Sequence, residues 1–146
     1  MQDFLGHPIV KGYIAANQFG ELLSKKFDIV GPGEVIYSMK VQEKHLATPI
    51  AAHGGSIAAL MDATMGVCAL SQVIEQNKVV STIEMKISFL APAKLGDNLE
   101  GTAQIVKNGH RILFVEGFIQ NQDGTKIAVA TGTFNAYPME KAGFAG

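Results

Sequence analysis

The stretch that decides the fold spans residues 53–76 and reads HGGSIAALMDATMGVCALSQVIEQ. Between residues 54 and 74 the only charged side chain is Asp62. The segment is long enough to cross a bilayer, but glycine, serine, threonine and glutamine interrupt its apolar residues, and a carboxylate in mid-bilayer is expensive. We therefore expect a helix over about residues 54–76 that is buried on nearly all sides of a soluble domain, with no membrane association.

The sequence after this helix changes to a period of two, which indicates strands with one buried face. In residues 82–90, and again in residues 99–105, apolar side chains alternate with polar ones. This alternation places Ile83 on the buried face of the first strand and Thr82 on the opposite face.

Two pairs of turn residues follow, Asn108-Gly109 and Asp123-Gly124. Each pair predicts a hairpin with a two-residue type I′ turn, because both central residues of that turn need a positive φ.

The part of the chain before the helix is less regular. Residues 31–33 (Gly-Pro-Gly) predict a turn, and the alternation in residues 35–41 predicts a strand. Residues 1–30 have apolar side chains at roughly helical spacing, so we expect a helical segment packed on a domain of residues 31–146. One strand, one buried helix and four long strands in a meander make an α+β domain, with the helix laid across an antiparallel sheet.

Composition limits the function classes. The 146 residues fit one domain, and a net charge of −1 offers no basic footprint for nucleic acid. Charged residues make up 17%, against roughly 25% in an ordinary domain, which suggests that part of the surface is buried against another subunit. The single Cys68 excludes an intramolecular disulfide, and the four histidines lack metal-ligand spacing. We expect no metal or cofactor and, without a signal peptide, a cytoplasmic protein.

Asp62 stands out as a carboxylate on an apolar helix. Its neighbours three and four residues away are small or apolar, and they leave room for a substrate: Ala58, Ala59, Met65 and Gly66. Two interpretations stay open. Asp62 is either held by a structural partner or by solvent, or it is a general base or nucleophile.

The helix start, His53-Gly54-Gly55-Ser56, has free backbone N–H groups at the positive end of the helix dipole. These groups could stabilise an anion or a polarised carbonyl. The alternative is that the glycines serve only a tight turn into the helix, with Ser56 as its cap.

Gly54 and Asp62 are eight residues apart, which is about 12 Å along a helix axis. They cannot both reach one reacting carbonyl from the same chain, because each must lie roughly 3 Å from the reacting atoms. If both are catalytic, two antiparallel helices across a two-fold axis must bring Gly54 of one subunit near Asp62 of the other.

Four features are also found together in a known family: the HGG triplet at residues 53–55, an aspartate nine residues after its histidine, the strand at residues 82–90 and the turn PAKLGD at residues 92–97. Over residues 34–137 the chain thus resembles the PaaI-like branch of the hotdog-fold acyl-CoA thioesterases. The resemblance implies a long central helix wrapped by a five- to six-stranded antiparallel sheet. It also implies a homodimer, usually doubled into a homotetramer, with acyl-CoA bound between subunits.

The resemblance also implies roles for single residues. Asp62 is expected to be the base or nucleophile, Gly54 to polarise the thioester carbonyl through its N–H, and Thr82 to position the attacking water. His53 is expected to shape the carbonyl-binding end. The expected substrate-binding residues are Gly55, Ala47, Thr48, Met61, Met65, Lys94 and Arg111, and further candidates for the coenzyme A phosphates are Lys86, Lys107 and His110.

One position departs from the family. Members commonly carry Asn or Gln about six residues before the histidine, where this chain has Ala47, with Thr48 and His45 as the neighbouring candidates to replace it. A missing carbonyl donor favours a rival hypothesis, a hotdog protein that binds an acyl ligand without hydrolysing it. A hydratase would need a histidine-centred site, and the sequence offers none.

Overall fold

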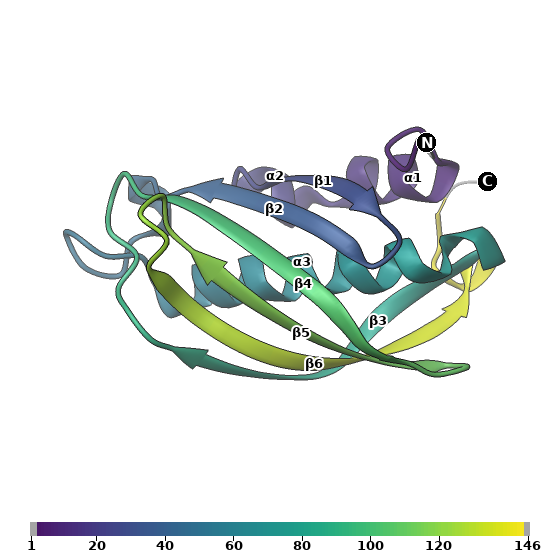
Figure 1. Cartoon of the computed structure of the whole chain (residues 1–146). Helices are drawn as coiled ribbons and strands as arrows, with labels where there is room; N and C mark the ends of the chain where they lie inside the picture. The colour runs from purple at the N-terminus through teal and green to yellow at the C-terminus, as the bar shows by residue number, and fades with distance from the viewer. Residues whose placement is uncertain (1–2, 145–146) are drawn as a thin grey trace.

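The computed structural model describes residues 3–144, which form one six-stranded sheet wrapped around one long helix (Figure 1). The helices are α1 (Pro8–Ala16), α2 (Gln18–Leu22) and α3 (Gly54–Val73), and single 3₁₀ turns lie at Glu43–His45, Ile74–Gln76 and Met139–Lys141. The strands are β1 (Lys26–Gly31), β2 (Glu34–Lys40), β3 (Lys78–Phe89), β4 (Asn98–Asn108), β5 (Ile112–Gln120) and β6 (Lys126–Pro138).

The sheet is antiparallel throughout, in the order β1-β2-β4-β5-β6-β3. The expected helix-on-sheet architecture is confirmed, but the four-strand meander is wrong, because β3 pairs with β6 at the edge instead of with β4. The loop at residues 90–97 carries the chain across the sheet, where the Gly96 N–H donates to the Val41 carbonyl beyond β2 (2.9 Å). Alternation specifies the face of a residue but not the neighbour of a strand, so the pattern could not reveal this crossing.

Helix α3 lies in the concave side of the sheet and supplies the centre of the core. Leu60, Met61, Met65 and Cys68 are all fully buried. The helix has the length and apolarity of a membrane span, and 67% of that window is buried inside the protein. Because the helix is buried against the sheet, its surface is as apolar as that of a membrane-spanning helix.

The N-terminal segment is helical only as far as α2. Ser24 takes a left-handed conformation (φ 57°), and residues 26–31 then form β1, which pairs with β2. The expectation of helix up to residue 30 is therefore wrong for the last residues of that segment. Phe27 and Ile29 alternate with charged neighbours, and this short period-two signal marked the strand.

Both predicted hairpins form, but their turns differ from the type I′ prediction. The Gly109 N–H donates to the Ile112 carbonyl (2.9 Å), so the β4–β5 turn is centred on residues 110–111. Neither Asn108 nor Gly109 has a positive φ. In the β5–β6 turn only Gly124 does (φ 78°), because the loop is longer than two residues and needs a single left-handed position.

Candidate active site

Asp62 and Thr82 meet directly within one chain. The Thr82 hydroxyl donates a hydrogen bond to Oδ1 of Asp62 at 2.7 Å. Asp62 lies on α3 and is half-buried, whereas Thr82 lies on β3 and is exposed. A carboxylate oriented by a hydroxyl, with solvent access on one side, can accept a proton from a bound water.

A β-bulge in β3 explains how Thr82 reaches the helix. Thr82 pairs with Phe134 and Glu84 pairs with Thr133, so Ile83 is an extra residue without a partner. Residues directly opposite in a sheet share a face, and Phe134 is buried, so Thr82 faces α3. Strict alternation placed Ile83 on the buried face; that expectation is wrong, because the bulge reverses the alternation and Ile83 is 56% exposed.

The Asp62–Thr82 pair lies in the wall of a cavity of about 270 Å³. Apart from this pair and Ser81, the cavity is lined by apolar and aromatic side chains and by one glycine. They come from α1, α3, β3, β6 and the C-terminal segment: Ile9, Tyr13, Ala63, Gly66, Val67, Leu70, Val79, Val80, Phe134, Tyr137, Ala142 and Phe144.

Two residues of the N-terminal segment shape the electrostatics near Asp62. The Lys25 ammonium donates to the Ala59 carbonyl on α3 (3.2 Å); burial lowers the pKa of Lys25, and the Asp62 carboxylate opposes that change. Burial raises the pKa of Tyr13, although a hydrogen bond with Tyr37 opposes the rise, and the charge of Asp62 raises it further. Sequence reasoning missed both residues, because they belong to no motif and lie far from Asp62 along the chain.

At the start of α3, His53 is the N-cap and its Nδ1 accepts the Gly55 N–H at 2.7 Å. The Ser56 N–H donates to the His53 carbonyl (2.9 Å). The Gly54 N–H donates to no residue in the described range 3–144. Gly54 borders a separate hollow of about 390 Å³ beside Phe89 and Leu90, so its N–H is a helix-end donor available to a ligand.

The hollow at Gly54 shares no lining residue with the cavity at Asp62. Their eight-residue separation on one straight helix keeps them about 12 Å apart. One chain therefore contains a base and a carbonyl-binding donor that cannot act on the same carbonyl.

The loop before the helix contains Ala47, the position at which the resemblance implies Asn or Gln. The Ala47 N–H donates to the Ala51 carbonyl (3.0 Å), and the Thr48 hydroxyl accepts the Ala51 N–H (3.0 Å). His45 is buried, with Nδ1 accepting the Gln42 N–H (2.9 Å) and Nε2 lying 2.7 Å from the Leu23 carbonyl. Both nitrogens of His45 are occupied, which leaves it a structural residue.

The sulfur-containing residues of α3 pack inside the core. Met61 and Met65 line neither the Asp62 cavity nor the Gly54 hollow; they lie under the sheet, where a Cβ on Gly117 would approach the Met65 Cγ to 3.1 Å. Cys68 donates to the Gly33 carbonyl (3.1 Å), and burial raises the pKa of its thiol to about 12. A thiol that stays protonated at neutral pH is a poor nucleophile.

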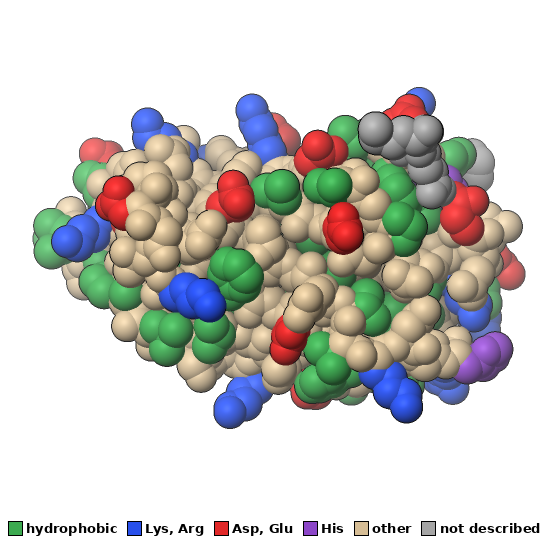
Figure 2. All heavy atoms as spheres, in the orientation of Figure 1, with side chains coloured by type: hydrophobic (Ala, Val, Ile, Leu, Met, Phe, Trp, Pro, Cys, Tyr) green, Lys and Arg blue, Asp and Glu red, His purple; other side chains and the backbone are tan. Residues whose placement is uncertain are grey.

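The structure separates the basic residues expected at the coenzyme A phosphates into different places, with Lys107, His110 and Arg111 together at the β4–β5 turn. Lys94 is exposed on the loop that pairs with Ala51, near the Gly54 hollow. Arg111 lies in the β4–β5 turn, where its Nε donates to the Asn135 side chain (2.9 Å). Lys107 and His110 are exposed near the same turn. On the face seen in Figure 2, several basic side chains gather near a histidine at the lower right, and the other lysines and arginines are scattered.

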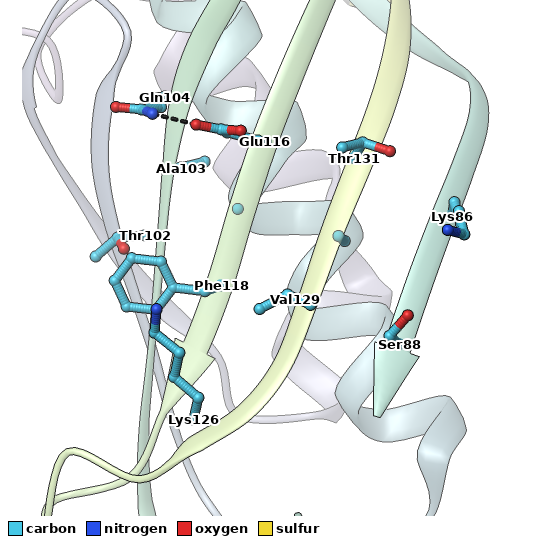
Figure 3. Close-up of a pocket in the computed structure, with 12 residues that line it drawn as sticks. Lys86, Ser88, Thr102, Ala103, Gln104, Glu116, Phe118, Lys126, Val129 and Thr131 are labelled. Carbon is cyan, nitrogen blue, oxygen red and sulfur yellow. Dashed lines mark hydrogen bonds between the residues drawn. The ribbon is translucent and has the colours of Figure 1, made fainter. Parts of the chain in front are cut away.

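Another hollow, of about 490 Å³, lies on the outer face of the sheet, away from α3 (Figure 3). Lys126 lies over the Phe118 ring at 4.8 Å, and the Gln104 side chain is hydrogen-bonded to Glu116. Lys86 also borders this hollow, whereas neither Asp62 nor Gly54 does. Residues 3–144 contain no cluster of three or more His, Cys, Asp or Glu side chains suited to a metal ion.

Comparison with known proteins connects this geometry to a family. The sequence model of the thioesterase superfamily matches residues 51–128, which include Gly54, Asp62 and Thr82. Human acyl-coenzyme A thioesterase 13 is 30% identical over 120 residues, covering 82% of this chain and 84% of that protein.

Solved structures show the same architecture. Escherichia coli PaaI, from the phenylacetic acid degradation operon, superposes with a TM-score of 0.80 at 22% identity, over 87% of this chain and 89% of that one. A Streptococcus mutans protein bound to acetyl-CoA superposes with a TM-score of 0.67 at 30% identity, over 77% of this chain and 90% of that one. The long central helix and six-stranded sheet thus form the hotdog fold.

Proposed function

Because this chain belongs to the thioesterase superfamily, we propose that it hydrolyses an acyl-CoA thioester to free coenzyme A and a carboxylic acid. One observation carries the proposal: Asp62 is hydrogen-bonded to Thr82 in the wall of an otherwise apolar cavity. An oriented carboxylate beside space for an acyl group is what thioester hydrolysis requires.

The chemistry follows from these groups. Asp62 takes a proton from a water held by the Thr82 hydroxyl, and the water oxygen attacks the thioester carbonyl carbon. Alternatively, Asp62 attacks that carbon itself and water then cleaves the resulting anhydride. In both routes the carbonyl oxygen gains negative charge, a backbone N–H stabilises it, and the C–S bond breaks to release coenzyme A. In the first route the sulfur receives the proton that Asp62 took from water. In the anhydride route the thiolate leaves and takes its proton from solvent water.

The N–H donor is assigned to Gly54 of a second subunit, which makes the active site a shared one. Support comes from the free Gly54 N–H and from its distance from Asp62 within one chain. The edge strand β3 supports the pairing: it is twelve residues long and exposes Ile83 and Phe89. An unpaired, partly apolar edge is a template for antiparallel addition of a second β3 across a two-fold axis.

The proposal also covers phosphate binding, a second subunit interface and the location of the protein. Lys94 lies on the loop that pairs with Ala51, beside the Gly54 hollow. It is therefore the basic residue that we propose for phosphate binding. A dimer of dimers would use a second surface, and the outer sheet face around Phe118 is the candidate. Cytoplasmic location stays a prediction from the sequence.

The second candidate function is acyl-CoA binding without hydrolysis. The observation that favours it is Ala47, which has no side-chain donor at the loop position where relatives commonly carry an amide. His45 does not replace that donor, since both of its ring nitrogens are already engaged.

The deciding experiment measures coenzyme A release from aliphatic and aromatic acyl-CoA thioesters by wild type and Asp62→Asn. We expect hydrolysis by the wild type and a loss of at least 100-fold in kcat for the variant, which has no base. Asn is close to Asp in size, so circular dichroism should show an intact fold. Tight acyl-CoA binding with no release by the wild type would establish the second candidate instead.

A further inference from the structure

The Asp62 cavity has one reactive end and an apolar remainder. Among the described residues that line it, Asp62 is the only charged one, and it lies there with Thr82. From this pair the cavity passes along α3 beside Ala63, Gly66 and Val67 towards Leu70. A thioester carbonyl held at Asp62 would therefore direct its acyl chain along α3, while the polar coenzyme A stays towards solvent.

The two terminal segments of the chain cover this cavity. Ile9 and Tyr13 of α1 line it from one side, and Phe144 near the C-terminus lines it from another. Helix α1 and the segment that follows β6 lie close together here (Figure 1). A Cβ on Gly12 would lie 3.7 Å from the Phe144 ring, so the ring packs against α1 at a position without a side chain.

The attachment of α1 also involves the far end of the central helix. Nε2 of His7, the N-cap of α1, lies 3.8 Å from Oε1 of Glu75, just beyond α3. The cover is therefore held at the end of the cavity opposite Asp62.

We infer that this cavity receives the apolar acyl chain of the substrate and that the terminal segments, through Ile9, Tyr13 and Phe144, set the chain length accepted. The inference rests on the proposed thioesterase function. All three residues lie outside residues 51–128, the part matched by the superfamily model. The cover that limits the chain length thus belongs to parts of this chain outside the region matched by the superfamily model, whereas the side of the cavity along α3 lies within that region.

The chain-length dependence has a size that can be measured. Each methylene that enters an apolar cavity contributes about 0.8 kcal/mol, or about fourfold in affinity or kcat/KM. Along a series of linear acyl-CoAs, kcat/KM should rise by this factor for each added methylene until the chain reaches the cover. Beyond that length kcat/KM should stop rising.

Four variants test the inference by kcat/KM on acetyl-, hexanoyl-, octanoyl-, dodecanoyl- and palmitoyl-CoA. Ala63→Leu fills the cavity and should lower octanoyl-CoA hydrolysis at least tenfold relative to acetyl-CoA. Phe144→Ala opens the far end and should raise the dodecanoyl to octanoyl ratio at least tenfold. Ile14→Ala, on the exposed side of α1, is the matched control and should keep the wild-type profile.

Gly66→Ala adds one methyl group to the cavity wall without a clash, because its Cβ would lie at an ordinary 3.6 Å from the Phe134 ring. It should lower octanoyl-CoA hydrolysis relative to acetyl-CoA by about fourfold. If Ala63→Leu, Gly66→Ala and Phe144→Ala all keep the wild-type chain-length profile, the inference is overturned even though the hydrolysis stands.

A binding measurement separates this inference from the proposed function. Calorimetry with the non-hydrolysable thioethers S-propyl-, S-octyl- and S-dodecyl-CoA reports the cavity without turnover. Chain-length-dependent affinity that Ala63→Leu and Phe144→Ala change as described supports the inference, even in a protein that releases no coenzyme A. Equal affinity for all three thioethers contradicts it, whatever the activity.

Discussion

The proposed role of the Gly54 N–H as a hydrogen-bond donor can be tested by removing this one donor. Its N–H is the first of α3, and proline is tolerated at the first position of a helix, where it removes only this donor. The preceding His53 has φ −64° and ψ 136°, which suits a residue before proline. We expect Gly54→Pro to lower kcat by about 100- to 1,000-fold while the fold is kept.

The matched control is Gly54→Ala, which keeps the N–H. Its Cβ would lie 3.5 Å from the Phe89 ring, an ordinary contact. We expect kcat within about tenfold of wild type for this variant. Equal losses for alanine and proline would mean that crowding beside Phe89, and not the donor, limits the reaction.

Cys68 should make stability depend on pH in alkaline solution. Its pKa is raised by burial from 9.0 to about 12, so between these values the unfolded chain loses the thiol proton while the folded protein keeps it. The contribution is fully present below pH 9 and is lost as pH rises towards 12. Thermal melts of wild type and Cys68→Ala should show the steeper decline in wild type; parallel declines would contradict this.

The candidate catalytic residues can be picked out from the sequence, but their surroundings cannot. Asp62 and the HGG triplet stand out because charge is absent from the rest of a long apolar helix. Tyr13, Lys25 and Phe144 carry no such mark, since they gain their positions only through the packing of the terminal segments around α3. Met61 and Met65, expected at the substrate, pack in the core because the glycines of β5 and β6 let the helix approach the sheet.

At the scale of elements, the β1–β2 turn is fastened to the central helix. The buried Gly33 N–H donates to the Ser71 hydroxyl (2.8 Å), which donates in turn to the Cys68 carbonyl (2.7 Å). Gly33 has φ 76°, a conformation that favours glycine. Ser71→Ala leaves a buried donor unsatisfied, so we expect a loss of about 1–3 kcal/mol in the free energy of unfolding.

Urea denaturation measures this loss, and Ser38→Ala provides the control. The Ser38 hydroxyl also bonds a backbone carbonyl, that of Lys26, but on an exposed strand and at 3.3 Å. Its removal should change the midpoint little. A Ser71→Ala midpoint equal to that of Ser38→Ala would show that the turn does not depend on this bond.

The elements themselves were predictable to different degrees. Helix α3 and the period-two strands follow from long, consistent patterns. Strand β1 was missed because its six residues come directly after a helical segment. The position of β3 beside β6 depends on a loop that crosses the sheet, and no local pattern encodes such a crossing.

At the scale of the molecule, a shared site allows two inactive variants to repair each other. A dimer of one Asp62→Asn subunit and one Gly54→Pro subunit contains one site with both groups intact and one site with neither. Random mixing makes half of the dimers mixed, so we expect about a quarter of wild-type activity from co-refolded protein. Each variant refolded alone is the control. If the mixture recovers no activity, Asp62 of one subunit and Gly54 of the other do not form a shared site.

The bulge at Ile83 also affects how relatives should be compared. Deleting Ile83 would leave Thr82 opposite Phe134 and Glu84 opposite Thr133, so the strand would become regular with Thr82 still facing α3. If an extra residue in β3 were accommodated in the regular pleat instead of in a bulge, Thr82 would turn to the outer face. Against a relative whose strand lacks the bulge, an alignment without a one-residue gap at this point would therefore match Thr82 to the wrong column. Short insertions and deletions in β3, as well as substitutions, can in this way remove or restore the hydroxyl beside Asp62 during evolution.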